Sequence, residues 1–194
     1  MNQTISYYEE HAAEFCKSTL DADMTFCRNR FLKYLDPQSH ILDAGCGSGR
    51  DSKAFIDLGH SVTAIDASPK ICEEAEKVLG QKVLCRSFEE LEMEKLFDGI
   101  WACASLLHVP RGKMPEVLCR LKRALKDDGI LYASFKYGAG EVTKQGRHFS
   151  NYDEKALRKL MEGAGFEVLE LFVTEDIRVD RRGEKWVNGI GKGK

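Results

Sequence analysis

The sequence has no long apolar run and no strong excess of charge of either sign. Nowhere do about 18 apolar residues follow one another, the length at which a membrane-spanning helix is expected. The first residues are polar and acidic and lack the apolar core of a secretory leader. The 29 basic and 31 acidic side chains give a net charge of -2, so no global field attracts the chain to phosphate backbones or anionic lipid. We therefore expect a soluble, cytoplasmic protein with no membrane partner and no sign of a nucleic-acid partner.

Closely spaced cysteine pairs are missing too. The seven cysteines are an odd number, and no two of them stand at the C-x-x-C spacing of zinc or redox sites. Most lie in apolar surroundings, where a reduced thiol packs like a small hydrophobic residue. We expect free, mostly buried thiols and no metal site.

Only 4 prolines interrupt the 194 residues, and no linker-like segment or internal repeat divides them. With 43% hydrophobic residues, this length predicts a single domain over residues 1–194. Apolar residues at helical spacing predict an N-terminal helical extension over residues 1–37, with a break near residues 20–23. The extension ends at Asp36-Pro37, because the residue before proline is pushed out of the helical conformation.

Residues 38–194 alternate short apolar runs with helical segments, which predicts a mostly parallel sheet covered on both faces. The helix expected after the second strand begins at Ser68-Pro69, a helix cap followed by proline. Glycines at positions 80, 129 and 165 stand where helices should stop. The expected strands are 40–44, 61–66, 82–86, 98–105, 129–137 and 166–173, and the helices between them are 50–59, 68–80, 88–96, 110–125 and 153–165.

The C-terminal segment departs from this alternation. Only 11 residues separate strand 166–173 from the apolar segment 185–190, too few for a helical crossover. The last strand should therefore run antiparallel, which completes a doubly wound, Rossmann-like α/β fold with a seven-stranded sheet. Residues 137–152 have no periodic pattern and are expected to form a long loop, a type that is usually functional or disordered.

Three alternating glycines follow the first predicted strand, in the sequence ILDAGCGSGRDS at residues 41–52. They occupy the first strand-to-helix turn, where ligands of open α/β sheets bind. A dinucleotide-binding G-x-G-x-x-G motif would need glycine at position 50, where the chain has Arg50, and no phosphate-loop lysine follows. Taken alone, the glycines are also consistent with an ordinary tight turn.

Asp66 supplies the second signal, because it ends the next predicted strand, 19 positions after Gly47. A carboxylate at this place can accept hydrogen bonds from ribose hydroxyls. A strand-end aspartate can also simply cap a turn, although Ser68-Pro69 already begins the next helix. Together with the glycines, Asp66 favours a nucleoside-binding site.

The segment Asp43-Ala-Gly45-Cys-Gly47-Ser-Gly49, followed by Asp66, resembles the class I S-adenosylmethionine-dependent methyltransferases. Residues 97–110 resemble the fourth-strand region of the small-molecule branch of that group, the tellurite-resistance-like and methyltransferase-11-like enzymes. The resemblance covers residues 40 to about 136 by motif and the rest by strand order. It implies S-adenosyl-L-methionine as cofactor and methyl transfer to a small molecule.

By this resemblance, the methionine half of the cofactor would contact Asp43, Gly45 and Gly47, with main chain near Ala104 facing its amine. Asp66 would hold the ribose, and Ser87 and Phe88 would flank the adenine. Many members of that family carry an acid at about the position of Ser87 to meet the adenine amine, and this chain has serine there. The full set of expected cofactor-binding residues is Asp43, Gly45, Gly47, Arg50, Asp66, Ala67, Ser87, Phe88 and Ala104.

His108 is the candidate catalytic residue, because imidazole titrates near neutral pH and this residue follows the fourth strand. It can equally pack against the N-terminal helices or hydrogen-bond a carbonyl group. Tyr7 and Tyr8 could form a lid or belong to the half-buried core. A base is needed only if the acceptor arrives protonated, so oxygen, nitrogen, sulfur and metalloid acceptors all stay open.

Cationic residues flank the predicted long loop and the last turn, and they could bind a carboxylate or phosphate of the substrate. The acids Glu175, Asp176, Asp180 and Glu184 favour instead a charge-balanced, solvated turn. Trp186 is expected in the core. The candidate substrate residues are Tyr8, Lys136, Tyr137, Arg147 and Arg178, and Arg181, Arg182 and His148 lie close to them in sequence.

Three other functions compete with small-molecule methyl transfer. An RNA- or tRNA-modifying methyltransferase is one, although the chain has Ala104-Ser105-Leu106-Leu107 in place of the Asn/Asp-Pro-Pro-aromatic signature of amino-methylating enzymes. A binding module that holds S-adenosylmethionine without turnover is another, because cofactor motifs do not establish catalysis. A nicotinamide oxidoreductase is opposed by Arg50. The sequence indicates no particular oligomeric state.

Overall fold

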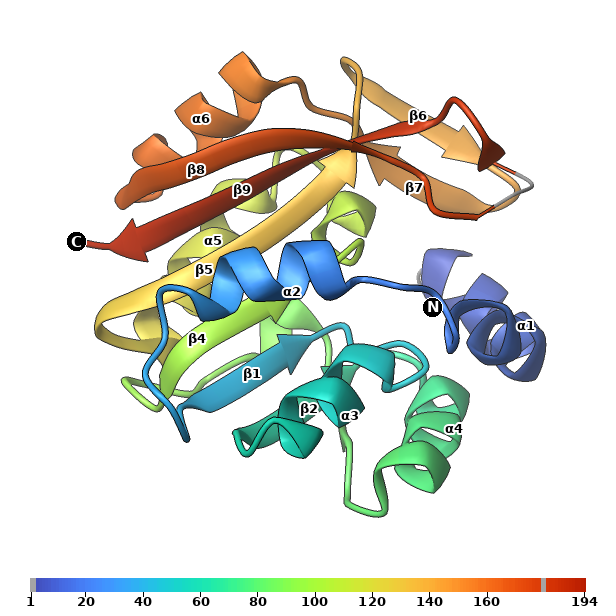
Figure 1. Cartoon of the computed structure of the whole chain (residues 1–194). Coiled ribbons are helices and arrows are strands. Elements are labelled where there is room, and N and C mark those ends of the chain that lie inside the picture. The colour runs from blue at the N-terminus through green and yellow to red at the C-terminus, as the bar shows by residue number, and fades with distance from the viewer. Residues whose placement is uncertain (1–2, 179–180) are drawn as a thin grey trace.

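Seven strands form one twisted sheet with helices on both faces (Figure 1). The computed structural model describes residues 3–178 and 181–194. The strand order β3-β2-β1-β4-β5-β9-β8 and the pairing of β1, β2, β3, β4 and β5 confirm the predicted mostly parallel sheet. The strands are β1 (His40–Ala44), β2 (Ser61–Asp66), β3 (Leu84–Cys85), β4 (Phe97–Ala102), β5 (Leu125–Lys136), β8 (Phe166–Glu175) and β9 (Lys185–Gly193).

The last strand, β9, lies antiparallel between β5 and β8, as predicted from the short connection that precedes it. Two of its glycines let the helix behind it approach closely. A Cβ added to Gly189 would lie 2.6 Å from Met161 Sδ, and one on Gly191 would lie 2.8 Å from Met161 Cε. The absence of side chains here lets α6 (Glu154–Gly163) pack directly against the strand.

The helices divide between the two faces (Figure 1). One face carries α2 (Thr25–Leu32), α3 (Arg50–Asp57) and α4 (Pro69–Leu79), and the other carries α5 (Met114–Ala124) and α6. The predicted start of α4 is confirmed, because Ser68 Oγ accepts a hydrogen bond from the Ile71 N–H at 3.2 Å and Pro69 is the first helical residue. The first helix, α1 (Gln3–Thr19), packs beside α4.

Alternate residues of the central strands point to opposite faces and build two apolar layers. Leu42 belongs to the layer under α5 and α6, whereas its neighbour Ile41 belongs to the layer under α2 and α3. In the second layer Trp101 stacks on Tyr132 with ring centroids 3.9 Å apart. Phe31 of α2 is fully buried there, so α2 is part of the core, and only α1 remains for the lid that we expected of the N-terminal extension.

Residues 88–96 do not form the expected helix. A single turn, η1 (Phe88–Glu90), follows Ser87, and the chain then runs irregularly to β4. Within that run, Lys95 has a φ of +45°, and its N–H bonds to Arg123 O at the end of α5. The segment is therefore held by tertiary contacts, which override its helical propensity.

The predicted long loop contains a hairpin made of β6 (Glu141–Lys144) and β7 (Arg147–Ser150). Gln145 and Gly146 form its two-residue turn with φ values of +51° and +74°, the combination that favours tight hairpins. Strands of four residues are too short for their alternation to stand out in the sequence. Gly129 does not stop a helix either, because α5 runs directly into β5, within which Gly129 lies.

All seven cysteines are free, as expected, and most are buried or half-buried, with Cys85 and Cys119 exposed. Among the described residues, no helix has both the length and the apolar character needed to cross a bilayer.

Candidate active site

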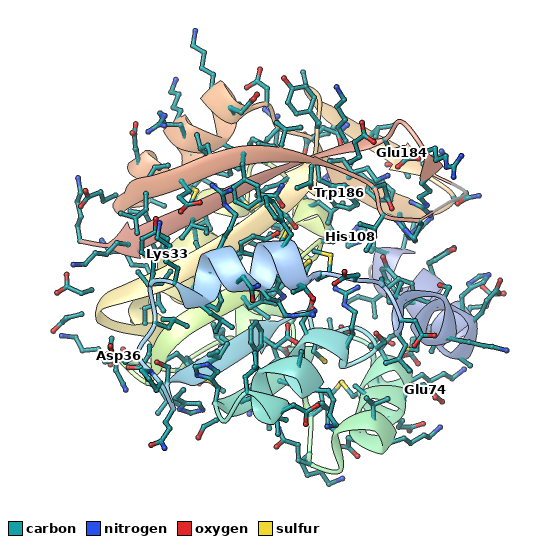
Figure 2. The ribbon with its side chains drawn as sticks, viewed as in Figure 1. Lys33, Asp36, Glu74, His108, Glu184 and Trp186 are labelled. Carbon is teal, nitrogen blue, oxygen red and sulfur yellow. The ribbon has the colours of Figure 1, made fainter. Side chains whose placement is uncertain are left out.

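The carboxyl ends of the parallel strands open onto an elongated cavity of about 330 Å³. This volume is typical of small-molecule sites, which span ~300–1,000 Å³. The strand order reverses between β1 and β4, and ligands of open α/β sheets bind at such a switch point. Figure 2 shows His108, Trp186 and Glu184 toward the end of the molecule where α1 lies, and Lys33 and Asp36 at the opposite end.

The turn between β1 and α3 borders this cavity with bare backbone. Gly45, Gly47 and Gly49 have φ values of +85°, +53° and +78°, which side-chain-bearing residues rarely adopt. The Gly45 N–H donates to Ile65 O at 3.0 Å and so ties the turn to β2. A Cβ on Gly45 would lie 2.4 Å from Ser105 Cβ. Both conformation and space therefore demand glycine at this position.

Asp66 ends β2 and forms the cavity wall beside this turn. Its carboxylate accepts hydrogen bonds from the N–H groups of Gly47 at 3.2 Å and Ser68 at 3.0 Å. Burial raises the pKa of Asp66 to about 6, although these N–H groups oppose the shift. The carboxylate thus caps the turn into α4 and also lines the cavity.

Asp43 lies beneath the glycine turn and is 2% exposed. Its Oδ2 atom accepts a hydrogen bond from Ser52 Oγ at 2.6 Å. Burial, reinforced by the negative charge of Asp51, raises the pKa of Asp43 to about 7. Near neutral pH this side chain can therefore change its charge, and a cationic group in the cavity would favour the carboxylate form.

Arg50 also lines the cavity, but its guanidinium is already paired within the protein. Its Nη2 atom donates to Asp51 Oδ2 at 2.6 Å. Asp51 also accepts from Arg28 of α2 at 2.8 Å and from Trp101 Nε1 at 3.0 Å. Arg50 therefore belongs to a network that fastens α2 and α3 to the sheet next to the cavity.

The wall beyond β2 and β3 contains three of the expected residues, Ala67, Ser87 and Phe88. The N–H and hydroxyl groups of Ser87 donate to Glu90 Oε2 at 2.8 and 2.9 Å, so its side chain fixes the start of η1. The ring of Phe88 reaches the glycine turn, where its Cζ would lie 3.6 Å from a Cβ on Gly45. Phe88 therefore offers a flat apolar surface beside the bare backbone.

Ala104 follows β4 in the left-handed conformation, with a φ of +51°. Its N–H donates to Ser134 Oγ of β5 at 2.8 Å. The next residue, Ser105, donates from Oγ to Ala44 O at 2.6 Å. These bonds hold the end of β4 against both neighbouring strands, at the floor of the cavity.

His108 lies in the cavity wall and is hydrogen-bonded on both ring nitrogens. Nδ1 is 2.7 Å from His148 O, and Nε2 is 2.9 Å from the hydroxyl of Tyr8 on α1. Because a carbonyl oxygen only accepts, Nδ1 carries the proton and Nε2 accepts from Tyr8. Burial lowers the pKa of His108 to about 4, so the ring is neutral at physiological pH. His108 therefore borders the cavity and bonds a carbonyl group, and its assignment as a catalytic residue stays a prediction.

The far wall holds two of the candidate substrate cations. Arg147 of β7 is 7% exposed, and its guanidinium lies 4.2 Å from the ring centroid of Tyr7. Lys136 ends β5 and pairs with Glu184, and burial lowers the pKa of this lysine to about 8. Trp186, expected in the core, packs on the core and also borders the cavity.

The turn before β9 is largely charge-balanced in its described part. Arg178 borders the cavity but forms an ion pair with Asp176 at 2.8 Å. Arg181 also borders the cavity and lies 4.0 Å from Glu184, whereas Arg182 is exposed. Asp180 lies outside the described residues. These contacts favour a balanced turn over a set of free arginines that converge on a substrate.

Tyr137 is wrong as a substrate candidate. Its side chain is 44% exposed, does not border the cavity and hydrogen-bonds to Glu154. It is the first residue after β5, and strand alternation points it away from the side that Lys136 occupies.

Sequence reasoning missed several residues of the site. Phe15 of α1 roofs the glycine turn and would lie 3.4 Å from a Cβ on Gly47. Asp51 and Arg28 form the network around Arg50, and no motif marked them. Within residues 3–178 and 181–194, no three His, Cys, Asp or Glu side chains are placed to hold a metal ion.

Comparison with known proteins agrees with this geometry. Residues 41–129, from β1 to β5, match the family model described as a methyltransferase domain. This stretch, a little under half of the chain, is therefore similar to a methyltransferase domain. The match includes the glycine turn, Asp66 and the end of β4, which are the parts of the cavity that we attributed to a cofactor.

Curated relatives align with part of the chain. Ubiquinone biosynthesis O-methyltransferase from Xanthomonas campestris is 36% identical over 106 residues, which are 50% of this chain and 43% of that protein. Malonyl-[acyl-carrier protein] O-methyltransferase from Salmonella typhimurium is 27% identical over 128 residues, 65% of this chain and 47% of that protein. The chain spans about half the length of these relatives.

The fold extends the similarity to nearly the whole chain. The crystal structure of a 1,6-didemethyltoxoflavin-N1-methyltransferase from Burkholderia thailandensis superimposes with a TM-score of 0.85. It covers 99% of this chain and 88% of that one at 21% identity, and it contains its substrate and S-adenosylhomocysteine. This likeness shows a shared fold that extends beyond the residues of the family match.

Proposed function

We propose that the chain transfers the methyl group of S-adenosyl-L-methionine to a small-molecule acceptor. The observation that carries the proposal is the continuity of the cavity. The glycine turn and Asp66 line the same space as Tyr8, His108 and Arg147. A cofactor on the first group and an acceptor on the second would meet with no solvent layer between them.

The residues at the β1–α3 turn fit the cofactor. A Cβ on Gly45 or Gly47 would narrow the space beside the turn. Because both residues lack one, their main chain can closely approach a ligand there. Asp66 would hold the ribose hydroxyls, Phe88 and Ala67 would flank the adenine, and Asp43 lies where the amino-acid part would end. Arg50 supports this wall through Asp51. When bound, the cofactor supplies an activated methyl group on a sulfonium centre.

The chain's own contribution is placement and exclusion of water. Bringing two reactants into one geometry removes most of the entropic barrier of a bimolecular reaction. Tyr8 and Phe15 of α1 roof the cavity and, together with the Tyr8–His108 hydrogen bond, close it on the acceptor side. The lone pair of His108 Nε2 accepts a hydrogen bond from the Tyr8 hydroxyl, so we assign His108 the role of positioning Tyr8. If a proton is removed from the acceptor, it would pass through the Tyr8 hydroxyl.

The enclosed acceptor side supports a small molecule. A nucleotide within RNA would have to enter beneath α1, and the net charge of -2 gives no electrostatic attraction to a polynucleotide. The free thiols suit a reducing compartment, and a cytoplasmic location is part of this proposal.

The test is methyl transfer from radiolabelled S-adenosylmethionine to a fractionated metabolite extract, with bulk tRNA in a parallel reaction. The proposal predicts label in a small-molecule fraction and none in tRNA, with loss of transfer in Asp66→Ala. Label in tRNA would support the RNA-modifying alternative. Saturable cofactor binding without label in any fraction would support the binding module.

A further inference from the structure

Arg147 differs from the other cations of the cavity in its surroundings. It lies on β7, is 7% exposed, and stacks on Tyr7 at 4.2 Å. Its Nη2 atom donates to Gln145 Oε1 at 3.0 Å, whereas its buried Nε–H has no hydrogen-bond partner. A buried donor without a partner costs free energy, so an unfilled Nε–H next to a cavity indicates a ligand.

No carboxylate of the described residues forms an ion pair with this guanidinium. The cations Lys136, Arg178 and Arg50 each have an acid within ion-pair distance, respectively Glu184, Asp176 and Asp51. Among the described residues, no Asp or Glu oxygen lies within 4.0 Å of the Arg147 nitrogens. A buried charge is normally paired, because desolvation is otherwise uncompensated.

The groups around Arg147 do not supply the missing charge. Tyr8 stays protonated, since burial raises its pKa even though Arg147 opposes the shift. His108 is neutral at physiological pH and hydrogen-bonded on both nitrogens. Tyr7 and Phe149 offer only ring faces, with centroids 4.2 and 5.4 Å from the guanidinium carbon. The positive charge of Arg147 therefore faces the acceptor side of the cavity without a balancing anion in the part of the chain that the structure describes.

We propose that Arg147 binds a carboxylate of the methyl acceptor, so that the acceptor is an acidic small molecule. This inference rests on the proposed function, and it names the substrate class. The planar guanidinium offers two parallel N–H groups to a carboxylate, and charge-assisted bonds of this kind are short and strong. A carboxylate adds one negative charge, which would balance the positive charge of Arg147.

Arg147 also has a structural neighbour, because its stack on Tyr7 joins β7 to α1. A purely structural arginine would affect the stability of that contact and the binding of all ligands alike. It would not distinguish an acid from an uncharged ligand of the same shape. The ratio of the two affinities therefore separates recognition from support.

The experiment uses matched pairs of probes on the full chain saturated with S-adenosylhomocysteine. Acetate and acetamide, benzoate and benzamide, and 2-naphthoate and 2-naphthamide are titrated by calorimetry, together with inorganic phosphate. We expect at least one acid to bind about tenfold or more tightly than its amide, from the strength of charge-assisted hydrogen bonds. Arg147→Met should abolish this ratio, and Arg147→Lys should retain part of it because lysine keeps the charge but not the fork.

Arg111→Met is the matched control. Arg111 also stacks on a tyrosine, at 4.2 Å from the ring centroid of Tyr152, and it also has an unpartnered Nε–H. It does not border the cavity, and its positive charge acts on Glu141. The preference for the acid should survive this substitution.

The inference would be overturned if no acid binds more tightly than its amide, or if the preference persists in Arg147→Met. Phosphate binding tighter than every carboxylate would also overturn it, in favour of a phosphorylated acceptor. If S-adenosylhomocysteine itself does not bind, the proposed function fails, and the same titrations on the free protein still decide whether Arg147 selects acids.

Discussion

Gly45 is the residue whose chemical identity matters most for the turn. Gly45→Ala should destabilise the fold by about 3 kcal/mol or more, because strain at positive φ adds to a collision with Ser105 Cβ at 2.4 Å. Gly59→Ala is the matched control, since Gly59 has a φ of +89° but nothing within 4 Å of an added Cβ. Its cost should be about 1 kcal/mol. Urea denaturation measures both, and equal costs would show that the space beside Gly45 is not limiting.

The raised pKa of Asp66 predicts that cofactor binding depends on pH. Its pKa is raised to about 6, so the carboxylate is present above that pH and is protonated below it. Only the carboxylate accepts hydrogen bonds from two ribose hydroxyls at full strength. The affinity for S-adenosylhomocysteine should be constant above about pH 7 and about tenfold weaker near pH 5.

Calorimetry across this range checks the dependence on Asp66. Asp66→Asn should bind more weakly at neutral pH and lose most of the change, because asparagine does not titrate. An unchanged affinity of the wild type between these pH values would contradict the assignment of Asp66 to the ribose.

The site could be predicted only where a residue's role follows from its own backbone position. Gly45, Gly47 and Asp66 were recognisable because strand ends and turns fix them locally. Phe15 borders the cavity, and Arg28 bonds to Asp51 in the cavity wall. Both residues come from helices that pack by tertiary contacts, and nothing in their sequence neighbourhood reveals these positions. Tyr137 was wrong because adjacent residues at a strand end point to opposite sides.

At the scale of elements, α1 acts as the roof of the cavity. Tyr8 bonds to His108, and Glu9 accepts hydrogen bonds from Ser68 Oγ and, at 2.9 Å, from the Lys70 N–H at the start of α4. A ligand beneath α1 should add contacts with Phe15 and Tyr8 and reduce local opening. Hydrogen exchange of α1 should slow when S-adenosylhomocysteine binds.

The comparison for this measurement is α6, which lies on the other face of the sheet and borders no part of the cavity. Its exchange should change little. Equal protection of both helices would indicate global stabilisation, and no protection of α1 would remove its role as a lid.

Elements were predicted well where length made their periodicity visible. Strands β1 and β2 have the expected bounds, and α3, α4 and α6 begin and end within two residues of the expected positions, whereas α5 begins four residues later than expected. The hairpin β6–β7 was missed because each strand has four residues. The predicted helix 88–96 failed because contacts with α5 compete with its local propensity.

At the scale of the whole molecule, His108 links stability to pH. Its pKa is lowered to about 4 in the folded protein, below its ordinary value of 6.5, so the folded state binds fewer protons between these values. Its contribution is fully present above about pH 6.5 and is lost as the pH falls toward 4.

His108→Gln should therefore cost about 2 kcal/mol less at about pH 5 than at about pH 7.5, from the proton linkage of a single group. Asp43 and Asp66 have raised pKa values and act in the opposite direction. Both are present in the wild type and in the variant, so their contributions cancel in the cost of the substitution at each pH. Urea denaturation at both pH values gives the difference. An equal cost at both would mean that His108 is not buried in its neutral form.

The seven-stranded architecture could be predicted because the alternation of strands and helices and the short last connection leave few topologies. The acceptor side of the cavity could not be predicted in this way. It is built by α1, η2 (Leu106–His108), β7 and β9, which come from distant parts of the chain. Sequence patterns therefore predicted the lining of the cavity near the glycine turn more completely than the lining near α1 and β7.

The central claim is that the bare turn after β1 and the carboxylate at the end of β2 bind the nucleoside of the methyl donor. Calorimetric titration of the full chain with S-adenosylhomocysteine, beside NADH, tests it most directly. The account predicts saturable binding of one S-adenosylhomocysteine per chain, no binding of NADH, and an affinity at least about tenfold weaker in Asp66→Ala. A folded wild-type protein that shows no heat with S-adenosylhomocysteine at millimolar concentration, or binds equally well without the Asp66 carboxylate, would contradict it.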